Sequence, residues 1–292
     1  MVLVHPQGPY DLGLSLKAAS AFSPGPHTSE AVLRTPAKVG RTPAIIEVRQ
    51  VQASPPVLEA SSPQRIDPKA LKKKAEWITL ADLDLSPFYA LSEGHPQLGP
   101  VTRLLHGLKH LRPASIFEMA VIAITEQQIS LAAAYRVRER LVKRFGQEID
   151  GLWIFPDPEN LARAAPSELA SCGLSSRKAE YVSDLARNVH DGRLDLDSIK
   201  AMSDEEARAF ITAIRGFGRW SADYILIRGL GRVDAVPADD LGVRTVLGRA
   251  LGGGPRMTAA EVEDALAPLR PYRGLATFYL LAYSRLTKAG PG

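Results

Sequence analysis

The feature that most constrains the fold of this 292-residue chain is the spacing of its apolar residues. From about residue 85 onward, apolar residues recur at the intervals typical of α-helices. The spacing predicts helices over 99–109, 115–127, 130–145, 158–164, 167–172, 176–189, 204–213, 219–229, 240–250, 259–268 and 272–287. Earlier β-type runs such as 44–52, broken by prolines, predict a small antiparallel sheet, and 67–77 reads as a Lys-rich helix or linker. We therefore expect a mainly α protein, with a small N-terminal α+β sheet domain and linker over 1–85 and an all-α domain over 86–292.

Composition excludes several kinds of site. With 36 Lys and Arg against 32 Asp and Glu, the net charge of +4 suits a polyanionic partner without requiring one. The single Cys172 excludes an internal disulfide, a Cys-based zinc site and a cysteine-ligated iron–sulfur cluster, and the six histidines show no metal-binding spacing. No apolar run is long enough to cross a membrane, and the N-terminus lacks the pattern of a signal peptide, so we expect a cytoplasmic protein.

Residues 209–231, AFITAIRGFGRWSADYILIRGLG, predict two helices joined by a tight turn. Gly216 and Gly218 are expected to allow positive φ angles in this turn and to leave its backbone amides bare. Bare amides at the start of a helix bind phosphate well, and Arg219 adds a positive charge there. The turn is therefore a candidate site for a nucleic-acid backbone.

The segment VPADDLGV (236–243) places two neighbouring carboxylates, Asp239 and Asp240, directly before a predicted helix. An Asp in this position is more often a helix N-cap than a catalytic group. The two roles are compatible, because one carboxylate can cap a helix and also face a pocket.

The order of these two features carries a resemblance. This order consists of a predicted helix, the turn Ile-Arg-Gly-Phe-Gly-Arg-Trp-Ser-Ala, a second helix and then Pro-x-x-Asp-Leu-Gly. It resembles the helix-hairpin-helix DNA glycosylase superfamily. Residues 116–146, 173–186 and 271–283 are similar to helices of its AlkA-type 3-methyladenine DNA glycosylase II branch, and 10–16 is similar to the start of that branch's sheet domain. The resemblance implies a two-lobed helical domain with the active site in the cleft between its lobes.

Roles follow from this resemblance residue by residue. It implies that Asp240 is the catalytic carboxylate, which would stabilise the positive charge that develops on the sugar when an N-glycosidic bond breaks. It implies that Gln127 and Gln128 enter the gap left by a flipped nucleotide. The expected pocket residues are Trp220, Tyr224, Leu241 and Leu281.

The resemblance also implies how DNA is held. The expected contacts are the hairpin turn with Gly216, Phe217, Gly218 and Arg219, the helix start with Ser175, Ser176 and Lys178, and the nearby Arg244. A monovalent cation, Na⁺ or K⁺, could be held by backbone carbonyls of Thr212, Ile214 and Phe217, as is frequent in the superfamily. No other cofactor is expected.

The expected function is that of a monofunctional DNA glycosylase, acting as a monomer on double-stranded DNA that contains an alkylated purine. Trp220 stands where the bifunctional branches have a lysine nucleophile, so no strand cleavage is expected. Two alternatives stay open: a glycosylase for oxidised or deaminated purines, and a non-catalytic lesion-binding protein in which Asp240 only caps its helix.

Overall fold

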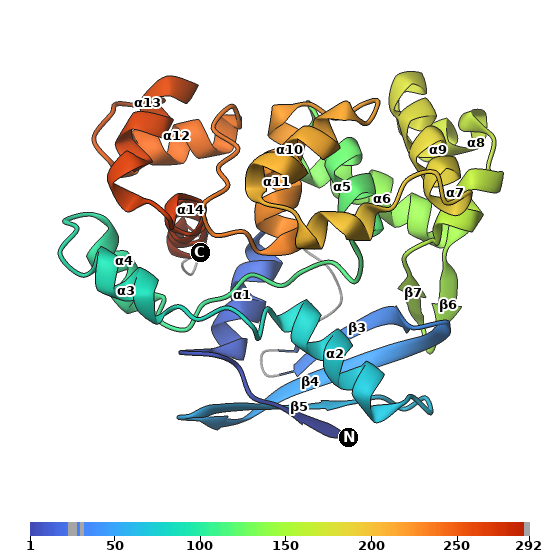
Figure 1. Ribbon diagram of the computed structural model, residues 1–292, viewed down its shortest axis with the longest axis horizontal. Helices are drawn as coiled ribbons and strands as arrows, with labels where there is room; N and C mark the ends of the chain where they lie inside the picture. Colours follow the sequence, from blue (N-terminus) through green and yellow to red (C-terminus); the bar gives the residue numbers. More distant parts are fainter. Residues whose placement is uncertain (23–27, 30–31, 289–292) are drawn as a thin grey trace.

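The computed structural model describes residues 1–22, 28–29 and 32–288 as a mainly helical protein on a small sheet (Figure 1). The helices in the first two-thirds of the chain are α1 (Leu12–Phe22), α2 (Pro68–Thr79), α3 (Ser86–Ser92), α4 (Leu98–Leu104), α5 (Ile116–Glu126), α6 (Leu131–Phe145), α7 (Pro158–Arg163), α8 (Pro166–Ser171) and α9 (Ser176–His190). The chain continues through η1 (Leu196–Ala201), α10 (Asp204–Ala213), α11 (Arg219–Ile225), η2 (Leu226–Leu230), α12 (Leu241–Ala250), α13 (Ala259–Leu266), η3 (Ala267–Leu269) and α14 (Arg273–Lys288). The prediction of a mainly α fold with a small N-terminal sheet is confirmed.

The N-terminal sheet is antiparallel, with strand order β1-β5-β4-β3-β2. The strands are β1 (Val2–Val4), β2 (Thr28–Ser29), β3 (Val32–Val39), β4 (Thr42–Ala53) and β5 (Pro56–Ser61). One sheet face buries apolar residues such as Ile46, Val48 and Leu58 together with Leu71 and Ala75 of α2. The Lys-rich segment at 67–77 is therefore a helix whose apolar side covers the sheet, as Figure 1 shows.

Two elements differ from the expectations. Residues 10–16, which the resemblance placed at the start of the sheet domain, lie mostly in α1, a helix that was not among those expected. Its Leu12 and Leu16 pack in the core of the sheet domain, and its Ala18 packs in the same core cluster as Phe278 of α14. The region 86–292 is not all-α, because β6 (Gln147–Ile149) and β7 (Leu152–Ile154) pair as a hairpin. Its turn is Asp150-Gly151, with φ of 47° and 76° at the two positions. Asp-Gly is a typical signal for such a turn, so the sequence did contain this hairpin.

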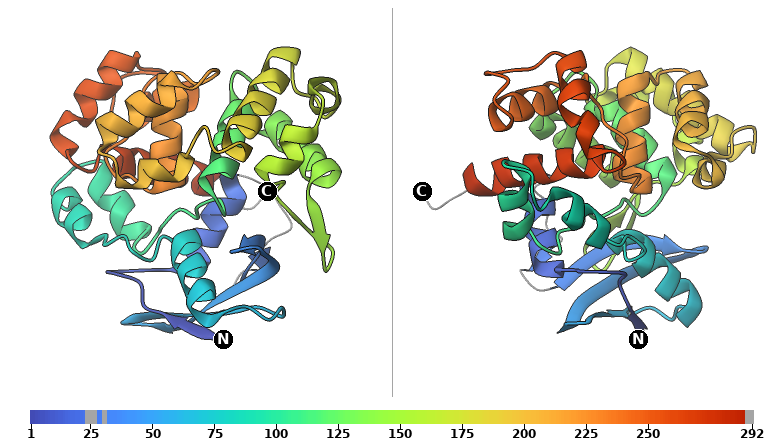
Figure 2. Two further views of the ribbon diagram at one scale, coloured as in Figure 1. Left: turned by 45° about the vertical axis from the view of Figure 1, so that its right-hand side comes forward. Right: turned by 60° about the vertical axis from the view of Figure 1, so that its left-hand side comes forward.

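The helical region forms two lobes, each with its own core. The first lobe is built mainly from α5 to α11, and the second from α3, α4 and α12 to α14; Figure 2 shows them side by side above the sheet. The helix starts follow from local chemistry, since Ser130, Ser203 and Thr258 each accept a hydrogen bond from the backbone three residues on. No helix in residues 1–22 and 32–288 has the length and apolar character needed to span a membrane.

Candidate active site

Asp240 is the N-cap of α12 and also faces a cavity. Its Oδ1 accepts a hydrogen bond from the backbone N–H of Val243 at 3.0 Å, and its Oδ2 accepts one from Trp220 Nε1 at 2.9 Å. Asp239, one residue earlier, is exposed and does not line the cavity. The fold therefore separates the two neighbouring carboxylates, and the one that caps the helix is also the one that reaches the cavity.

The cavity has a volume of about 660 Å³ and extends between the two helical lobes and the sheet. Its walls come from α5, α6, α11, η2, α12 and α14, with Thr35 and Pro36 of β3 and residues of the β6–β7 hairpin at one end. A volume of this size lies in the range of pockets that enclose small organic ligands. All four expected pocket residues line this cavity together with Asp240; they are Trp220, Tyr224, Leu241 and Leu281.

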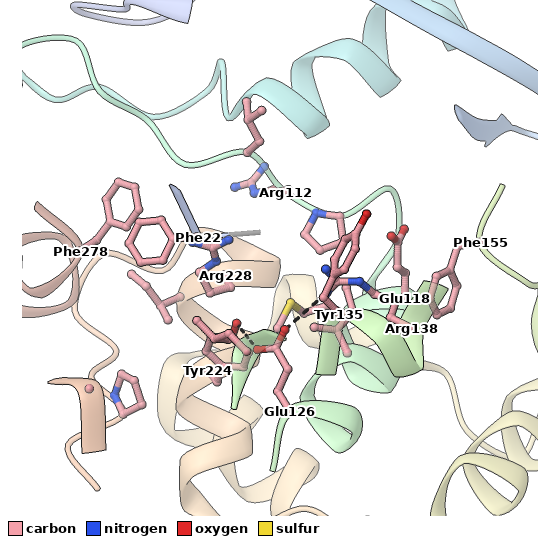
Figure 3. Close-up of a pocket in the computed structure, with 18 of the residues that line it drawn as sticks. Phe22, Arg112, Glu118, Glu126, Tyr135, Arg138, Phe155, Tyr224, Arg228 and Phe278 are labelled. Carbon is pink, nitrogen blue, oxygen red and sulfur yellow. Dashed lines mark hydrogen bonds and ion pairs between the residues drawn. The ribbon is translucent and has the colours of Figure 1, made fainter. Parts of the chain in front are cut away.

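The wall beside Asp240 is aromatic. The rings of Trp220 and Tyr224, one helical turn apart on α11, stack with centroids 5.1 Å apart and an interplanar angle of 20°. The hydroxyl of Tyr224 donates to Glu126 Oε2 at 2.7 Å, and burial raises the pKa of this hydroxyl. Glu126 in turn pairs with Arg138 at 3.4 Å, and Figure 3 shows its carboxylate between the two partners.

The cavity also contains aromatic rings and guanidinium groups that sequence reasoning missed. Phe22 stacks against Phe278 at 5.9 Å, and the guanidinium groups of Arg228 and Arg285 lie 5.5 and 4.6 Å from the Phe22 ring centroid. Burial, and secondarily the charge of Arg228, lowers the pKa of Arg285. No local signal marks Phe22, because it ends a helix that is remote in sequence from the other cavity residues.

Leu241 and the two glutamines occupy the rims of the site. Leu241 is 57% exposed at the cavity, whereas Gln127 and Gln128 line a separate, shallow groove of about 420 Å³. Gln127 Nε2 donates to the carbonyl of Gly216 at 2.8 Å and to Ser221 Oγ at 3.0 Å, which ties the α5–α6 junction to the hairpin. Gln128 is exposed with a φ of 54°, an uncommon backbone conformation for a residue other than glycine.

The hairpin turn needs only one of its two glycines for its backbone shape. Gly216 has a φ of 98°, and a Cβ there would lie 2.6 Å from the ring of Tyr181. Gly218 has a φ of −113°, which other residues adopt, so the expectation of a positive φ at this position is wrong. A Cβ on Gly218 would meet nothing within 4 Å, so this part of the turn is open toward the groove.

The turn amides are not all bare. The amide of Phe217 donates to the carbonyl of Ile214 at 3.1 Å, and Phe217 itself is buried. The same Ile214 carbonyl is one of the three proposed for a monovalent cation, with those of Thr212 and Phe217. Among the residues that the structure describes, no three His, Cys, Asp or Glu side chains gather as a metal site, and the single Cys172 is buried.

The cationic side chains expected to contact DNA have partners within the protein. Lys178 Nζ donates to the carbonyls of Thr125 at 3.0 Å and Gln127 at 2.5 Å, and thus closes the end of α5. Arg219 pairs with Glu263 at 2.6 Å and with Asp223 at 3.7 Å. Arg244 Nε donates to the carbonyl of Met257 at 2.7 Å. DNA contact by these side chains stays a prediction.

The start of α9 completes the groove. Ser175 is its N-cap and accepts a hydrogen bond from the backbone of Lys178 at 3.3 Å, and Ser176 is exposed in the first turn. The groove brings together this helix start, the hairpin turn and the α5–α6 junction, which are remote from one another in sequence. All three were expected to contact DNA, and they lie on one surface.

Known proteins resemble this chain over the same region. The sequence profile of the HhH-GPD superfamily base excision DNA repair proteins matches residues 121–271, slightly more than half of the chain. The chain belongs to this superfamily. The profile spans the hairpin, the Trp220–Asp240 pair and the two glutamines, whereas Phe22, Leu281 and Arg285 lie outside it.

Individual superfamily relatives extend the likeness. A DNA-3-methyladenine glycosylase from Bacillus subtilis is 32% identical over 209 residues, which cover 70% of this chain and 69% of that protein. DNA-3-methyladenine glycosylase 2 from Escherichia coli is 27% identical over 74% of this chain and 73% of its own length. The structure of the 3-methyladenine DNA-glycosylase from Archaeoglobus fulgidus superposes with a TM-score of 0.85 at 25% identity, covering 99% of this chain and all of that one.

Proposed function

We propose that this superfamily member is a monofunctional DNA glycosylase in base excision repair, which flips an alkylated purine out of duplex DNA and hydrolyses its N-glycosidic bond. The observation that carries the proposal is the position of Asp240, which is held by Trp220 and Val243 at the wall of a cavity large enough for a base. The names of the relatives from Bacillus subtilis and Escherichia coli support 3-methyladenine as a substrate.

The carboxylate of Asp240 acts on developing charge. When the bond between C1′ and the base nitrogen breaks, its electron pair leaves with the base and the sugar gains oxocarbenium character. A carboxylate fixed beside C1′ stabilises that charge more than it stabilises the ground state, which lowers the barrier. Water then adds its oxygen to C1′ and releases one proton, so the products are the free base and an abasic sugar.

Among the residues that the structure describes, no lysine is bonded to Asp240, which supports hydrolysis over strand cleavage. A lyase step needs a lysine that forms a Schiff base with C1′. The nearest group on α11 is Trp220, and the lysine that lines the cavity, Lys143, is paired with Glu139 at 2.8 Å near its far end. We therefore expect base release without a strand break.

DNA would lie along the groove formed by the hairpin, the start of α9 and the α5–α6 junction. Gly218 and the helix start at Ser175 would meet phosphates, and such contacts hold DNA without reading its sequence. Gln128, presented outward by its positive φ, would fill the gap of the flipped nucleotide through hydrogen bonds. A monovalent cation at the carbonyls of Thr212, Ile214 and Phe217, and action as a monomer, complete the proposal.

The test is a panel of duplexes containing 3-methyladenine, 7-methylguanine, hypoxanthine or 8-oxoguanine. We expect release of the methylated purines first, with intact strands until the abasic product is treated with alkali. Release of 8-oxoguanine or hypoxanthine alone would favour the alternative substrate classes. Tight binding to lesion or abasic DNA with no release of any base would favour a lesion-binding protein.

A further inference from the structure

The wall of the cavity that begins at Asp240 ends at a second carboxylate. Asp240 accepts from Trp220, Trp220 stacks on Tyr224, and Tyr224 donates to Glu126, the last residue of α5. Glu126 lines the same cavity. Its side chain is 10% exposed, and that of its ion-pair partner Arg138 is 19% exposed.

Glu126 can accept more hydrogen bonds than the protein gives it. A carboxylate has about four lone-pair positions and, when ionised, no donor. Tyr224 donates to Oε2 at 2.7 Å, and Arg138 lies 3.4 Å from Oε1. The two partners hold the group from either side, as Figure 3 shows, and leave acceptor positions for a molecule in the cavity.

A purine bound along this wall would place one of its ends near each carboxylate. The nitrogen bonded to the sugar lies on the five-membered ring, and the N1–C6 edge lies at the far side of the six-membered ring. If C1′ lies beside Asp240, a base along the Trp220–Tyr224 wall directs this far edge toward Glu126. An amino group at C6 would donate to the carboxylate. A carbonyl at C6 would oppose it with a second acceptor, and the only donor on that edge would be the neighbouring N1–H, which lies at a different position.

We propose that Glu126 determines specificity for alkylated adenines by accepting a hydrogen bond from the C6 amino group of the flipped base. This inference rests on the proposed glycosylase function. The negative charge of Glu126 also favours a base made cationic by alkylation. Such a contribution matters here because Leu241 and Leu281, on other walls of the cavity, provide no aromatic face for stacking.

The cavity also contains guanidinium groups, which would favour a base with a carbonyl at C6. Arg228 and Arg285 lie over the ring of Phe22, and the charge of Arg285 also acts on Asp240 and Glu126. If either of these guanidinium groups faced the C6 edge, a base with a carbonyl at C6 would be preferred and Glu126 would have no effect on the choice. The two arrangements therefore give different results on one pair of substrates.

The experiment compares single-turnover release of 3-methyladenine and hypoxanthine by the full chain and by Glu126→Gln. Glutamine keeps the size of the side chain and an oxygen that accepts from Tyr224, but adds a donor amide and removes the charge. We expect the ratio of the 3-methyladenine rate to the hypoxanthine rate to fall by about tenfold or more, as expected when a site built for a hydrogen bond loses its specificity.

Tyr224→Phe is the matched control, because it removes the Tyr224–Glu126 hydrogen bond, which Glu126→Gln can keep, and leaves the carboxylate in place. We expect this control to change both rates together. If Glu126→Gln also lowers both rates in parallel, or leaves the ratio unchanged, the inference is overturned and Glu126 only positions the aromatic wall. Failure of the unmutated protein to release either base would overturn the proposed function, and the inference with it.

A second measurement needs no variant and covers the case in which Glu126→Gln does not fold. Free 3-methyladenine and free hypoxanthine are added as inhibitors of the unmutated protein. We expect 3-methyladenine to inhibit at a concentration at least about tenfold lower, for the same hydrogen-bonding reason. Equal inhibition by the two bases would overturn the inference.

Discussion

The groove beside the hairpin and the cavity beside Asp240 use their polar groups in different ways. In the groove, Lys178 is bonded to protein carbonyls, and the exposed residues of the lining include the turn glycine Gly218 and the helix cap Ser175. In the cavity, the carboxylates of Asp240 and Glu126 are themselves presented on a wall of aromatic rings. A surface of backbone groups suits a repeating phosphate chain, whereas fixed side chains suit one kind of base.

If this difference is functional, cavity variants should change the chemical step and groove variants should change DNA affinity. Asp240→Asn should have the largest effect, because it removes the charge that stabilises the sugar cation. We expect base release to fall by about 100- to 1,000-fold, with binding to abasic DNA nearly unchanged. The measurements are single-turnover base release and fluorescence anisotropy with abasic duplex.

Asp239→Asn is the control for that experiment. Asp239 is exposed and away from the cavity, so little change is expected. A loss as large as that of Asp240→Asn would show that the other carboxylate acts on the sugar. Unchanged base release in Asp240→Asn would assign its carboxylate to helix capping alone.

Two alanine substitutions in the hairpin should separate folding from DNA contact. Gly216→Ala places a Cβ against Tyr181 at a φ of 98°, so we expect the free energy of unfolding to fall by about 1 to 3 kcal/mol. Gly218→Ala meets no protein atom, so it should lower the free energy of unfolding by less than about 1 kcal/mol.

Gly218→Ala should nevertheless weaken binding to duplex DNA, because the methyl group would stand between the backbone and a phosphate. Thermal melting and anisotropy titration test both variants. Full DNA affinity in Gly218→Ala would remove the turn from the proposed contact surface. Equal losses of stability in the two variants would contradict the assignment of the tight packing to Gly216.

Trp220→Phe should have a smaller effect on the chemistry. It removes the donor to Asp240 Oδ2 and keeps an aromatic ring beside Tyr224, while the bond from Val243 still holds Oδ1. A hydrogen bond to a charged group contributes about 1.5 to 3 kcal/mol, so we expect base release to slow by about 10- to 150-fold. DNA affinity should not change, and a loss confined to affinity would place Trp220 on the DNA side.

The smallest expected effect concerns pH and a buried acid of the cavity. Burial raises the pKa of Glu118 in the folded protein above its usual value of 4.5. Above pH 4.5 the unfolded chain loses this proton before the folded one does, so this group's contribution to stability falls as pH rises through the raised pKa. Glu118→Gln should lack that loss, and thermal melting from pH 4 to 8 would show a flatter profile. An unchanged profile would contradict the expectation.

Local signals allowed most helices to be predicted, and the residues that cap them could have been found in the same way. Ser130, Ser203 and Thr258 each precede an apolar helical pattern and each cap a helix in the structure. The β6–β7 hairpin is also encoded locally, in Asp150-Gly151, although the sequence analysis predicted no strands there. Helix α1 was not among the predicted helices, because its residues lie in a part of the chain where β-type runs and prolines predicted a sheet.

The sequence by itself determined the helical segments and the order of hairpin and Asp240, because both depend on residues that are close in the chain. The choice of Asp240 over Asp239 as the catalytic carboxylate came from the resemblance and stays a prediction. Only the tertiary structure decided that Phe22 and Glu126 share a cavity with Asp240. The same holds for the hydrogen bonds that Lys178 donates to the carbonyls at the C-terminal end of α5. These contacts join residues far apart in sequence, and their partners are chosen by packing and burial. No periodicity or spacing specifies which distant side chains will meet.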